Sequence, residues 1–230
     1  MLSKLSHENI VQYLGHEVID QAVCIYMEYI AGGDCFYFDT ALIYFFFVGN
    51  IQSIYSKFGA LPERTIKLYT RQILHGLEYL HQNRVIHMDL KGSNIFIDSN
   101  GKVKLTNFGC SSEIERTLTS GKKMEKEALK GSAPWMAPEV IKDSRYGRRA
   151  DIWALGCTVL EMATGKAPWS QYNIDNQITL FMQIALSDQI PEIPEHLSDN
   201  LKDFLVTCLQ RDPRKRPYAA ELLSHAFLQD

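Results

Sequence analysis

Several features that would set this chain apart from ordinary intracellular proteins are missing. Its five cysteines form no C-x-x-C pair and are odd in number, so a reducing, intracellular setting is expected. No apolar run reaches the roughly 18 residues of a membrane-spanning helix, and no apolar region follows residues 1–4 as in a signal peptide. The formal net charge of -3 argues against a broad basic surface for nucleic acid. We therefore expect a cytoplasmic protein with neither a membrane nor a nucleic-acid partner.

The composition that is present is that of a soluble globular protein. Apolar residues make up 46% of the 230 positions and charged residues 22%, which allows a buried core. The length suits one large domain or two small ones. Because no internal repeat or interdomain linker is visible, we treat residues 1–230 as one domain.

Two short runs near the N-terminus have the composition of β-strands. Residues 10–14 and 22–29 are rich in Ile, Val, Tyr and Cys, and a polar stretch at 17–21 separates them. This pattern predicts an antiparallel pair joined by a turn at 17–21. The Ala-Gly-Gly at 31–33 then ends the second strand.

The apolar period changes after Pro62. Apolar residues then recur at spacings of three and four, which predicts one long amphipathic helix over 62–82. Two strand-like runs follow at 95–97 and 103–105. The Asn-Gly turn between them is a strong hairpin signal.

The second half of the chain is predicted to be mainly helical. Residues 150–164 are apolar nearly all round, which is typical of a helix buried at the centre of a domain. Further helices are expected over 201–209 and 219–225. Residues 110–130 are polar and have few large apolar groups, so we predict a mobile loop there.

Residues 34–50 have an unusual composition. They read DCFYFDTALIYFFFVGN, and without them residues 31–33 would run into a plausible short helix start at Ile51. The segment is too short to span a bilayer, and Asp39 interrupts it. It is either an aromatic loop for a membrane surface or partner, or an unspliced intron whose Phe-rich text encodes a pyrimidine tract. We favour the intron.

The residues best suited to chemistry lie in the run 85–94, between the long helix and the hairpin. Asp89, Lys91 and Asn94 bring a carboxylate, an ammonium group and an amide to one loop. Phosphoryl transfer needs such a set: a carboxylate to orient a hydroxyl and accept its proton, a cation to offset phosphate charge, and an oxygen ligand for Mg²⁺. Taken alone, the run could also be a polar surface turn after a helix.

This run resembles the catalytic loop H-R-D-x-K-x-x-N of protein kinases. The resemblance implies that Asp89 is the catalytic base, Lys91 the phosphate-facing cation, and Asn94 a metal ligand within the ATP site. A lysine at position 91 resembles the serine/threonine-specific class. His87 is then expected to be a core histidine beneath Phe108 rather than a proton shuttle.

Four more motifs follow in the order found in kinases. Thr106 to Gly109 stands where kinases carry D-F-G, and Gly131 to Glu139 ends in A-P-E. Asp151 to Gly156 resembles the start of the central helix of the large lobe. Arg216 matches the arginine that pairs with the A-P-E glutamate, here Glu139.

The resemblance covers nearly the whole chain outside residues 34–50, and is greatest to mitogen-activated protein kinase kinase kinases. The runs that carry it are 7–15, 131–141 and 156–165. It implies an α+β, protein-kinase-like fold. We expect a mainly helical large lobe over 31–230, with the atypical insert 34–50, and a remnant of the β-rich small lobe with the hinge over 1–30.

The same resemblance places the hinge of the nucleotide site after the second strand. Met27 would be the gatekeeper. The Glu28 carbonyl and the Ile30 amide would bind the adenine edge. These contacts use backbone atoms, so the side chains constrain them little.

The chain departs from the kinase pattern at its front. No G-x-G-x-x-G precedes residue 10, and neither the V-A-I-K lysine nor its partner glutamate is present. We interpret the sequence as an N-terminally truncated kinase domain from a fragment or an incomplete gene model.

Two substitutions fall within the motifs themselves. Asn107 replaces the D-F-G aspartate, so the metal position keeps a carbonyl oxygen but loses its charge. Met88 replaces the H-R-D arginine and cannot pair with phosphate. Phosphorylation of the activation segment is therefore not expected to order it in the usual way; the candidate positions are Thr117, Thr119, Ser120 and Ser132. Ser132 is interpreted first as a hydroxyl that contacts the catalytic pair.

The resemblance implies ATP-dependent phosphorylation of serine or threonine in a protein, plausibly a downstream kinase of a mitogen-activated cascade, with ATP and Mg²⁺ as cofactors. The missing front and Asn107 predict weak or absent activity. The alternative is a catalytically dead pseudokinase that serves as a scaffold or allosteric partner.

Overall fold

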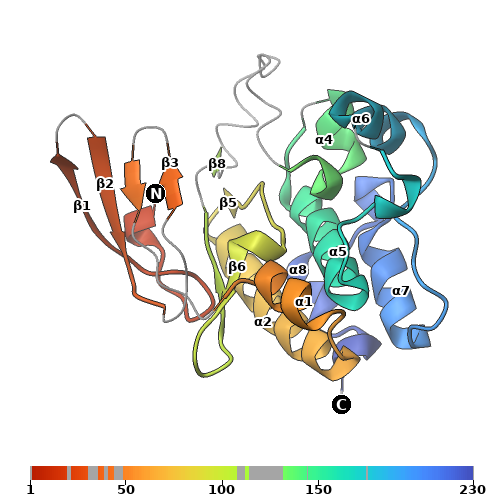
Figure 1. Ribbon diagram of the computed structural model, residues 1–230, viewed down its shortest axis with the longest axis horizontal. Coiled ribbons are helices and arrows are strands. Elements are labelled where there is room, and N and C mark those ends of the chain that lie inside the picture. The colour runs from red at the N-terminus through yellow and green to blue at the C-terminus, as the bar shows by residue number, and fades with distance from the viewer. Residues whose placement is uncertain are drawn as a thin grey trace.

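A computed structural model gives the arrangement of the chain (Figure 1). It describes residues 2–19, 22–30, 36–38, 41–43, 49–107, 112–113, 132–143, 145–174 and 176–229. Short strands gather on one side of the molecule and the helices on the other, so the fold is mixed with helices predominating. This agrees with the α+β class expected from the sequence.

The first sheet is the predicted antiparallel pair, but its turn was wrongly placed. Strand β1 spans Tyr13–Ile19 and β2 spans Ala22–Met27. Glu17, expected in the turn, pairs with Cys24 within the ladder. The error arose because β1 is largely exposed, and an exposed strand accepts polar residues without a cost in burial. Ile10 lies before the strand and forms a bridge with Leu105.

The insert contributes a second small hairpin, in which β3 (Phe36–Phe38) pairs with β4 (Ala41–Ile43). The rest of 31–48 lies outside the described residues. Helix α1 (Ile51–Phe58) begins directly afterwards, as predicted. Its start is fixed because the Asn50 side chain accepts a hydrogen bond from the Ser53 amide, at 2.7 Å.

The long helix predicted after Pro62 is confirmed. Helix α2 spans Glu63–Gln82, and the residues that recur at three- and four-residue spacing are buried against the main core. Strand β5 (Val85–Ile86) follows and pairs with β8 (Ser112–Glu113). The predicted hairpin is also present, as β6 (Ile95–Ile97) and β7 (Val103–Leu105).

Helix α5 (Arg148–Thr164) lies at the centre of the helical part, with α2 and α7 packed against it. It is buried nearly all round, as predicted, because neighbours cover it on every side. The surrounding helices are α4 (Pro138–Asp143), α6 (Gln177–Leu186), α7 (Asp199–Cys208) and α8 (Ala219–Leu222). Short 3₁₀ segments span Leu2–Lys4, Gly92–Asn94, Ala133–Trp135, Ser170–Tyr172, Pro213–Lys215 and Ala226–Leu228.

The predicted last helix, 219–225, is shorter than expected. Helix α8 ends at Leu222, and the chain continues through turns in which the His225 amide bonds to the Leu222 carbonyl. Phe227 and Leu228 then turn back into the main core. Burial of these two side chains therefore overrides continuation of the helix.

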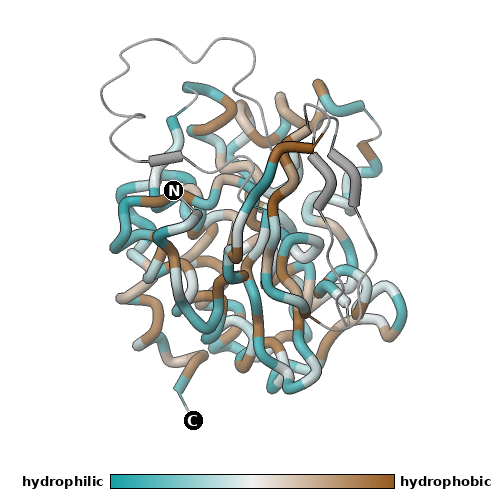
Figure 2. Tube along the Cα trace, turned by 90° about the vertical axis from the view of Figure 1, so that its left-hand side faces the viewer, coloured by the Kyte–Doolittle hydropathy of each residue, from teal (hydrophilic) through white to brown (hydrophobic). Residues whose placement is uncertain are grey.

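Hydrophobic positions are distributed over the elements that are coloured in Figure 2 instead of forming one long run. They build a main core around α2 and α5 and a second cluster around Trp153. Across the described residues, no helix is long and apolar enough to cross a membrane.

Gly156 sets the close approach of α5 to α7. A Cβ added there would lie 2.8 Å from the Cys208 Cβ and 3.0 Å from side-chain atoms of Leu209. We expect Gly156→Ala to lower the free energy of unfolding by about 1–3 kcal/mol, because the overpacking outweighs the gain in helix propensity. Urea unfolding measures this. Gly15→Ala is the matched control, since no atom lies within 4 Å of its added Cβ, and equal effects in both variants would contradict the packing argument.

Candidate functional site

The loop that follows β5 is held from below by the first turn of α5. The Asp151 carboxylate accepts hydrogen bonds from the amides of His87 and Met88, at 2.9 and 3.0 Å. The ring of His81, from α2, lies 2.8 Å from the same carboxylate. Met88 has a φ of 70°, in the left-handed region that non-glycine residues seldom adopt. The Asp151 bonds therefore hold a strained backbone in place beside Asp89.

Asp151 is ionised in this position although it is buried. Burial alone would raise the pKa of its carboxyl group, but the hydrogen bond and charge from His81 and the His87 amide together bring that pKa below its ordinary value. Burial lowers the pKa of His87, whose side chain is fully buried. Asp151 and His87 thus have structural positions beneath the loop.

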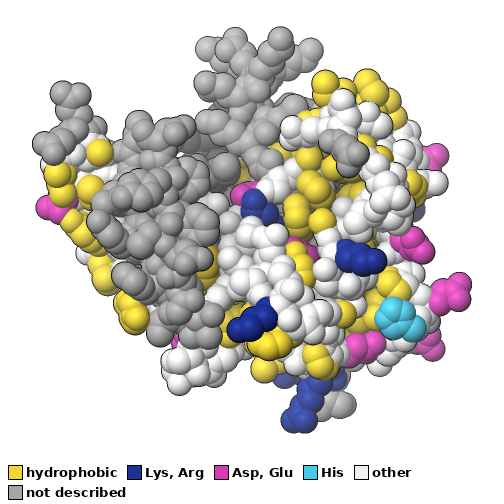
Figure 3. Space-filling model, in the orientation of Figure 1, with side chains coloured by type: hydrophobic (Ala, Val, Ile, Leu, Met, Phe, Trp, Pro, Cys, Tyr) yellow, Lys and Arg dark blue, Asp and Glu magenta, His cyan; other side chains and the backbone are white. Residues whose placement is uncertain are grey.

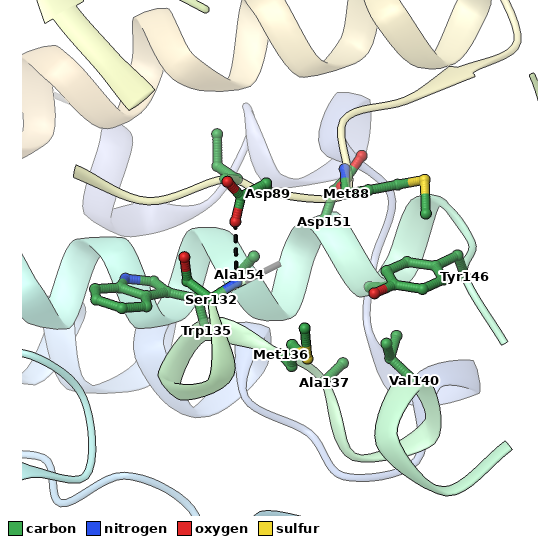
Figure 4. A pocket seen from close by; sticks show the side chains of 12 residues that line it. Met88, Asp89, Ser132, Trp135, Met136, Ala137, Val140, Tyr146, Asp151 and Ala154 are labelled. Carbon is green, nitrogen blue, oxygen red and sulfur yellow. Dashed lines mark hydrogen bonds between the residues drawn. The ribbon is translucent and has the colours of Figure 1, made fainter. Parts of the chain in front are cut away.

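Asp89 lies beside Ser132, which comes from the far end of the activation segment (Figure 4). Lys91 lies close to both of them. The Asp89 carboxylate accepts a hydrogen bond from the Ser132 amide at 3.1 Å. Lys91 Nζ lies 3.6 Å from the same carboxylate and donates to the Ser132 hydroxyl. The serine thus meets the lysine through its hydroxyl and the aspartate through its backbone. A carboxylate and an ammonium group this close can bind and orient a hydroxyl and offset negative charge beside it.

Asn94 and Asn107 face each other across this cluster. Asn94 Nδ2 donates to the Asp89 carboxylate at 2.8 Å, and Oδ1 is the single oxygen of the Asn94 side chain. Asn107 Nδ2 donates to that oxygen at 3.1 Å. Asn107 has a φ of 62°, a conformation that asparagine tolerates better than most residues.

The side chains of Asp89, Asn94 and Asn107 do not form a set of ligands that fits Mg²⁺ in this arrangement. The oxygen that Asn94 could offer already accepts a hydrogen bond from Asn107, and Asn107 adds no charge. Asp89 is the one carboxylate in this cluster, and the described part of the chain holds no group of three or more acidic, His or Cys side chains suited to a metal. Mg²⁺ prefers one or two carboxylates together with phosphate oxygens. In this arrangement the side chains therefore do not form a Mg²⁺ site.

The expected hinge residues lie at the end of β2 and directly after it. Met27 is half-buried against the main core, and Ile30 is buried within it. The Glu28 amide donates to the Gln12 carbonyl at 2.7 Å. The Glu28 carboxylate accepts from Lys104 Nζ at 2.6 Å. Because Lys104 lies in β7, this ion pair connects the end of β2 to the strand that leads to Asn107.

Glu139 and Arg216 form the expected pair. The guanidinium makes two parallel bonds to the carboxylate, at 2.7 and 2.9 Å. Its other N–H groups donate to the carbonyls of Gln210, Arg149 and Arg211. All five donors of a nearly fully buried arginine are thus satisfied.

Met88 packs its side chain against the second hydrophobic cluster, on the side of Tyr146 (Figure 4). The small pocket there is lined mainly by apolar residues of the segment 135–140 and of α5. An apolar contact therefore stands where the kinase pattern has an arginine. The candidate phosphorylation positions Thr117, Thr119 and Ser120, and the D-F-G-like Phe108, lie outside the described residues.

Sequence reasoning missed Glu161, which joins four parts of the site. From α5, its carboxylate accepts hydrogen bonds from the Tyr55 hydroxyl at 2.6 Å and from the Gly92 amide and Trp135 Nε1 at 3.0 Å. Burial raises the pKa of Glu161, although these three donors act against the increase. No local motif marks this glutamate, because its partners are far apart in the sequence.

A raised pKa at Glu161 has a consequence for stability against pH. The folded state takes up a proton more readily than the unfolded chain, so the stabilisation is full below the ordinary value of 4.5 and is lost as pH rises through the raised pKa. Glu161→Gln removes this dependence, and its amide can still donate to Tyr55 while its oxygen accepts from Gly92 and Trp135. We expect the variant to gain stability relative to the native chain as pH rises from 4.5 to 7. The slope should be at most about 1.4 kcal/mol per pH unit below the raised pKa and level off above it.

Urea unfolding at several pH values measures the difference between the two chains. Glu192→Gln, at an exposed position, is the control and should show no such trend. A difference between Glu161→Gln and the native chain that stays constant with pH would contradict the assignment.

Comparison with known proteins identifies the family to which the chain belongs. The sequence model of the protein kinase domain matches residues 1–228. The chain belongs to the protein kinase family. It is 44% identical over 230 residues to mitogen-activated protein kinase kinase kinase A of Dictyostelium discoideum, and 46% identical over 231 residues to mitogen-activated protein kinase kinase kinase YODA of Arabidopsis thaliana. Both alignments cover all of this chain.

The relatives are much longer than this chain. It spans 22% and 23% of those two proteins, and 32% of mitogen-activated protein kinase kinase kinase 2 of Arabidopsis thaliana, to which it is 43% identical. The sequence resemblance to this kinase group is thereby confirmed for the kinase domain.

On the face shown in Figure 3, charged side chains of both signs are scattered among apolar ones.

Proposed function

We propose that this kinase domain transfers the γ-phosphoryl group of ATP to serine or threonine hydroxyls of a protein. The single observation that carries the proposal is the cluster of Asp89, Lys91 and Ser132, in which the carboxylate and the ammonium group lie 3.6 Å apart. Asp89 would orient the acceptor hydroxyl and take its proton as the oxygen attacks the γ-phosphorus, while the bond from that phosphorus to the bridging oxygen breaks and ADP leaves. Lys91 would offset negative charge on the transferred group.

The substrate is proposed to be a downstream kinase of a mitogen-activated cascade. Support comes from the relatives, whose names place them in such a cascade. We also propose that residues 1–30 form the small-lobe part with its hinge, and residues 31–230 the large lobe. Met27, Glu28 and Ile30 would then receive the adenine of ATP.

The test is a phosphotransfer assay with γ-labelled ATP and casein as a mixed acceptor, followed by analysis of the labelled amino acids. Label on serine or threonine that disappears in Asp89→Asn is the expected result. Label that survives in Asp89→Asn, or that falls on tyrosine, would overturn the proposal.

A second function is favoured by the hydrogen bond between Asn107 and Asn94. If that hydrogen bond prevents Mg²⁺ from binding, the domain acts as a pseudokinase that retains a protein-binding surface. Absence of label in both the native chain and Asn107→Asp, with nucleotide binding intact, would favour this second function.

A further inference from the structure

A pocket of about 640 Å³ lies between the first turn of α5, the residues before it, and the segment 212–218. It is separate from the Asp89 cluster, since neither Asp89, Lys91 nor Ser132 lines it. Four arginines do: Arg145, Arg148, Arg149 and Arg214. What such a concavity can bind depends on which of these guanidinium groups already have a partner.

The acidic residues of the pocket are largely paired already. Glu139 is held by the buried Arg216, and Asp212 by two nitrogens of Arg214, at 2.9–3.2 Å. Asp143 lies 4.0 Å from Arg145. Arg148 and Arg149 are left, and no carboxylate of the described residues lies within ion-pair distance of either. The pocket therefore carries two positive charges in excess.

Arg149 provides a second and independent observation. Its guanidinium lies over the ring of Tyr218, 4.5 Å from the centroid, so the stack fixes its plane. Its Nε is buried and has no hydrogen-bond partner among the described residues. Burying an N–H donor without an acceptor costs free energy, and a bound acceptor would recover it.

The arginine and tyrosine side chains of the pocket indicate the chemical class of ligand that would supply the hydrogen-bond acceptor. Two guanidinium groups that line one pocket favour a tetrahedral oxyanion that can accept several N–H bonds at once, which is the geometry of phosphate. The pocket has room for more than the anion itself, and Tyr146 and Tyr218 add aromatic walls for the group that bears it. We propose that this pocket binds a phosphate monoester carried on a phosphorylated side chain.

The pocket lies beside the Glu139–Arg216 ion pair, so a ligand bound there would contact residues that hold the end of the activation segment. Glu139, at the end of the activation segment, and Arg149, whose carbonyl accepts from Arg216, both line the pocket. A phosphate bound to Arg148 and Arg149 would thus sit against the Glu139–Arg216 pair. This inference does not depend on the proposed phosphotransfer, because it concerns a different set of residues.

The test is thermal unfolding of the whole chain with O-phospho-L-serine, inorganic phosphate or serine, at constant ionic strength. At ten times Kd, phosphoserine should raise Tm by roughly 3–6 °C and serine should not. The rise should be lost in Arg148→Gln and in Arg149→Gln. It should persist in Arg64→Gln, an exposed arginine on α2.

Two variants keep the test falsifiable if one folds poorly. Arg148→Gln leaves the Arg149–Tyr218 stack in place, and Tm without ligand reports the folding of each variant. A phosphoserine response that survives in Arg148→Gln and Arg149→Gln, or no response in the native chain, would overturn the site. A response to inorganic phosphate alone would overturn the assignment to a phosphorylated side chain and leave a free-anion site.

Discussion

Replacing Asn107 by aspartate is expected to raise the rate of phosphoryl transfer by about 10²–10³-fold, the usual effect of one preorganised electrostatic group. In the native chain the Asn107 amide donates to Asn94 Oδ1, 3.1 Å away. A carboxylate at 107 cannot donate, so Asn94 Oδ1 becomes free to act as a ligand. The same change places a negative charge beside it, which is what Mg²⁺ prefers.

Initial rates at saturating ATP and Mg²⁺, measured with γ-labelled ATP, test this. Asn100→Asp is the matched control because it makes the same chemical change in the exposed turn between β6 and β7, and it should leave the rate unchanged. The gain should vanish in Asn107→Asp combined with Asp89→Asn. An unchanged rate in Asn107→Asp would show that the missing carboxylate is not what limits turnover.

Arg216→Met is expected to lower the free energy of unfolding by about 3–5 kcal/mol, the range found when one partner of a buried ion pair is removed. The Arg216 side chain is fully buried, and that of Glu139 is 14% exposed. Methionine fills much of the volume, but leaves Glu139 and three backbone carbonyls without their donors. For a chain of this length the fall in Tm should be roughly 10 °C.

Arg214→Met is the control for this prediction. That arginine also forms an ion pair in which two of its nitrogens donate hydrogen bonds to a carboxylate, here that of Asp212, but its side chain is 84% exposed. Because water replaces the lost bonds at such a site, the change in stability should be far smaller than in Arg216→Met. Similar losses in the two variants, by urea or thermal unfolding, would contradict the view that burial makes the Arg216 pair important.

The parts of the fold that sequence reasoning predicted are those with a strong local pattern. The three- and four-residue spacing of apolar residues predicted helix α2, and the Asn-Gly turn predicted the β6–β7 hairpin. The nearly continuous apolar sequence of 150–164 predicted α5. The turn of the first hairpin was misplaced at 17–21, because polar residues in an exposed strand look like a turn. Helix α8 was made too long, since the burial of Phe227 and Leu228 in the core has no local sign.

Within the candidate site, the sequence indicated the residues that belong to motifs. Asp89, Lys91 and Asn94 are close in the chain, so their meeting required only a loop. Glu161 and the Lys104–Glu28 pair could not be foreseen, because their hydrogen bonds join residues between 26 and 106 positions apart. The hydrogen bond from Asn107 to Asn94 was likewise unforeseen, although the substitution itself was evident.

The most direct test of this account is the dependence of nucleotide binding on Mg²⁺, compared between the native chain and Asn107→Asp. Thermal unfolding with millimolar nucleotide would be followed with and without the metal. We expect Mg²⁺ to change the nucleotide-induced rise in Tm little in the native chain and to increase it clearly in Asn107→Asp. An equally large Mg²⁺ effect in both chains would contradict it, because Asn94 and Asn107 would then already form a competent metal site.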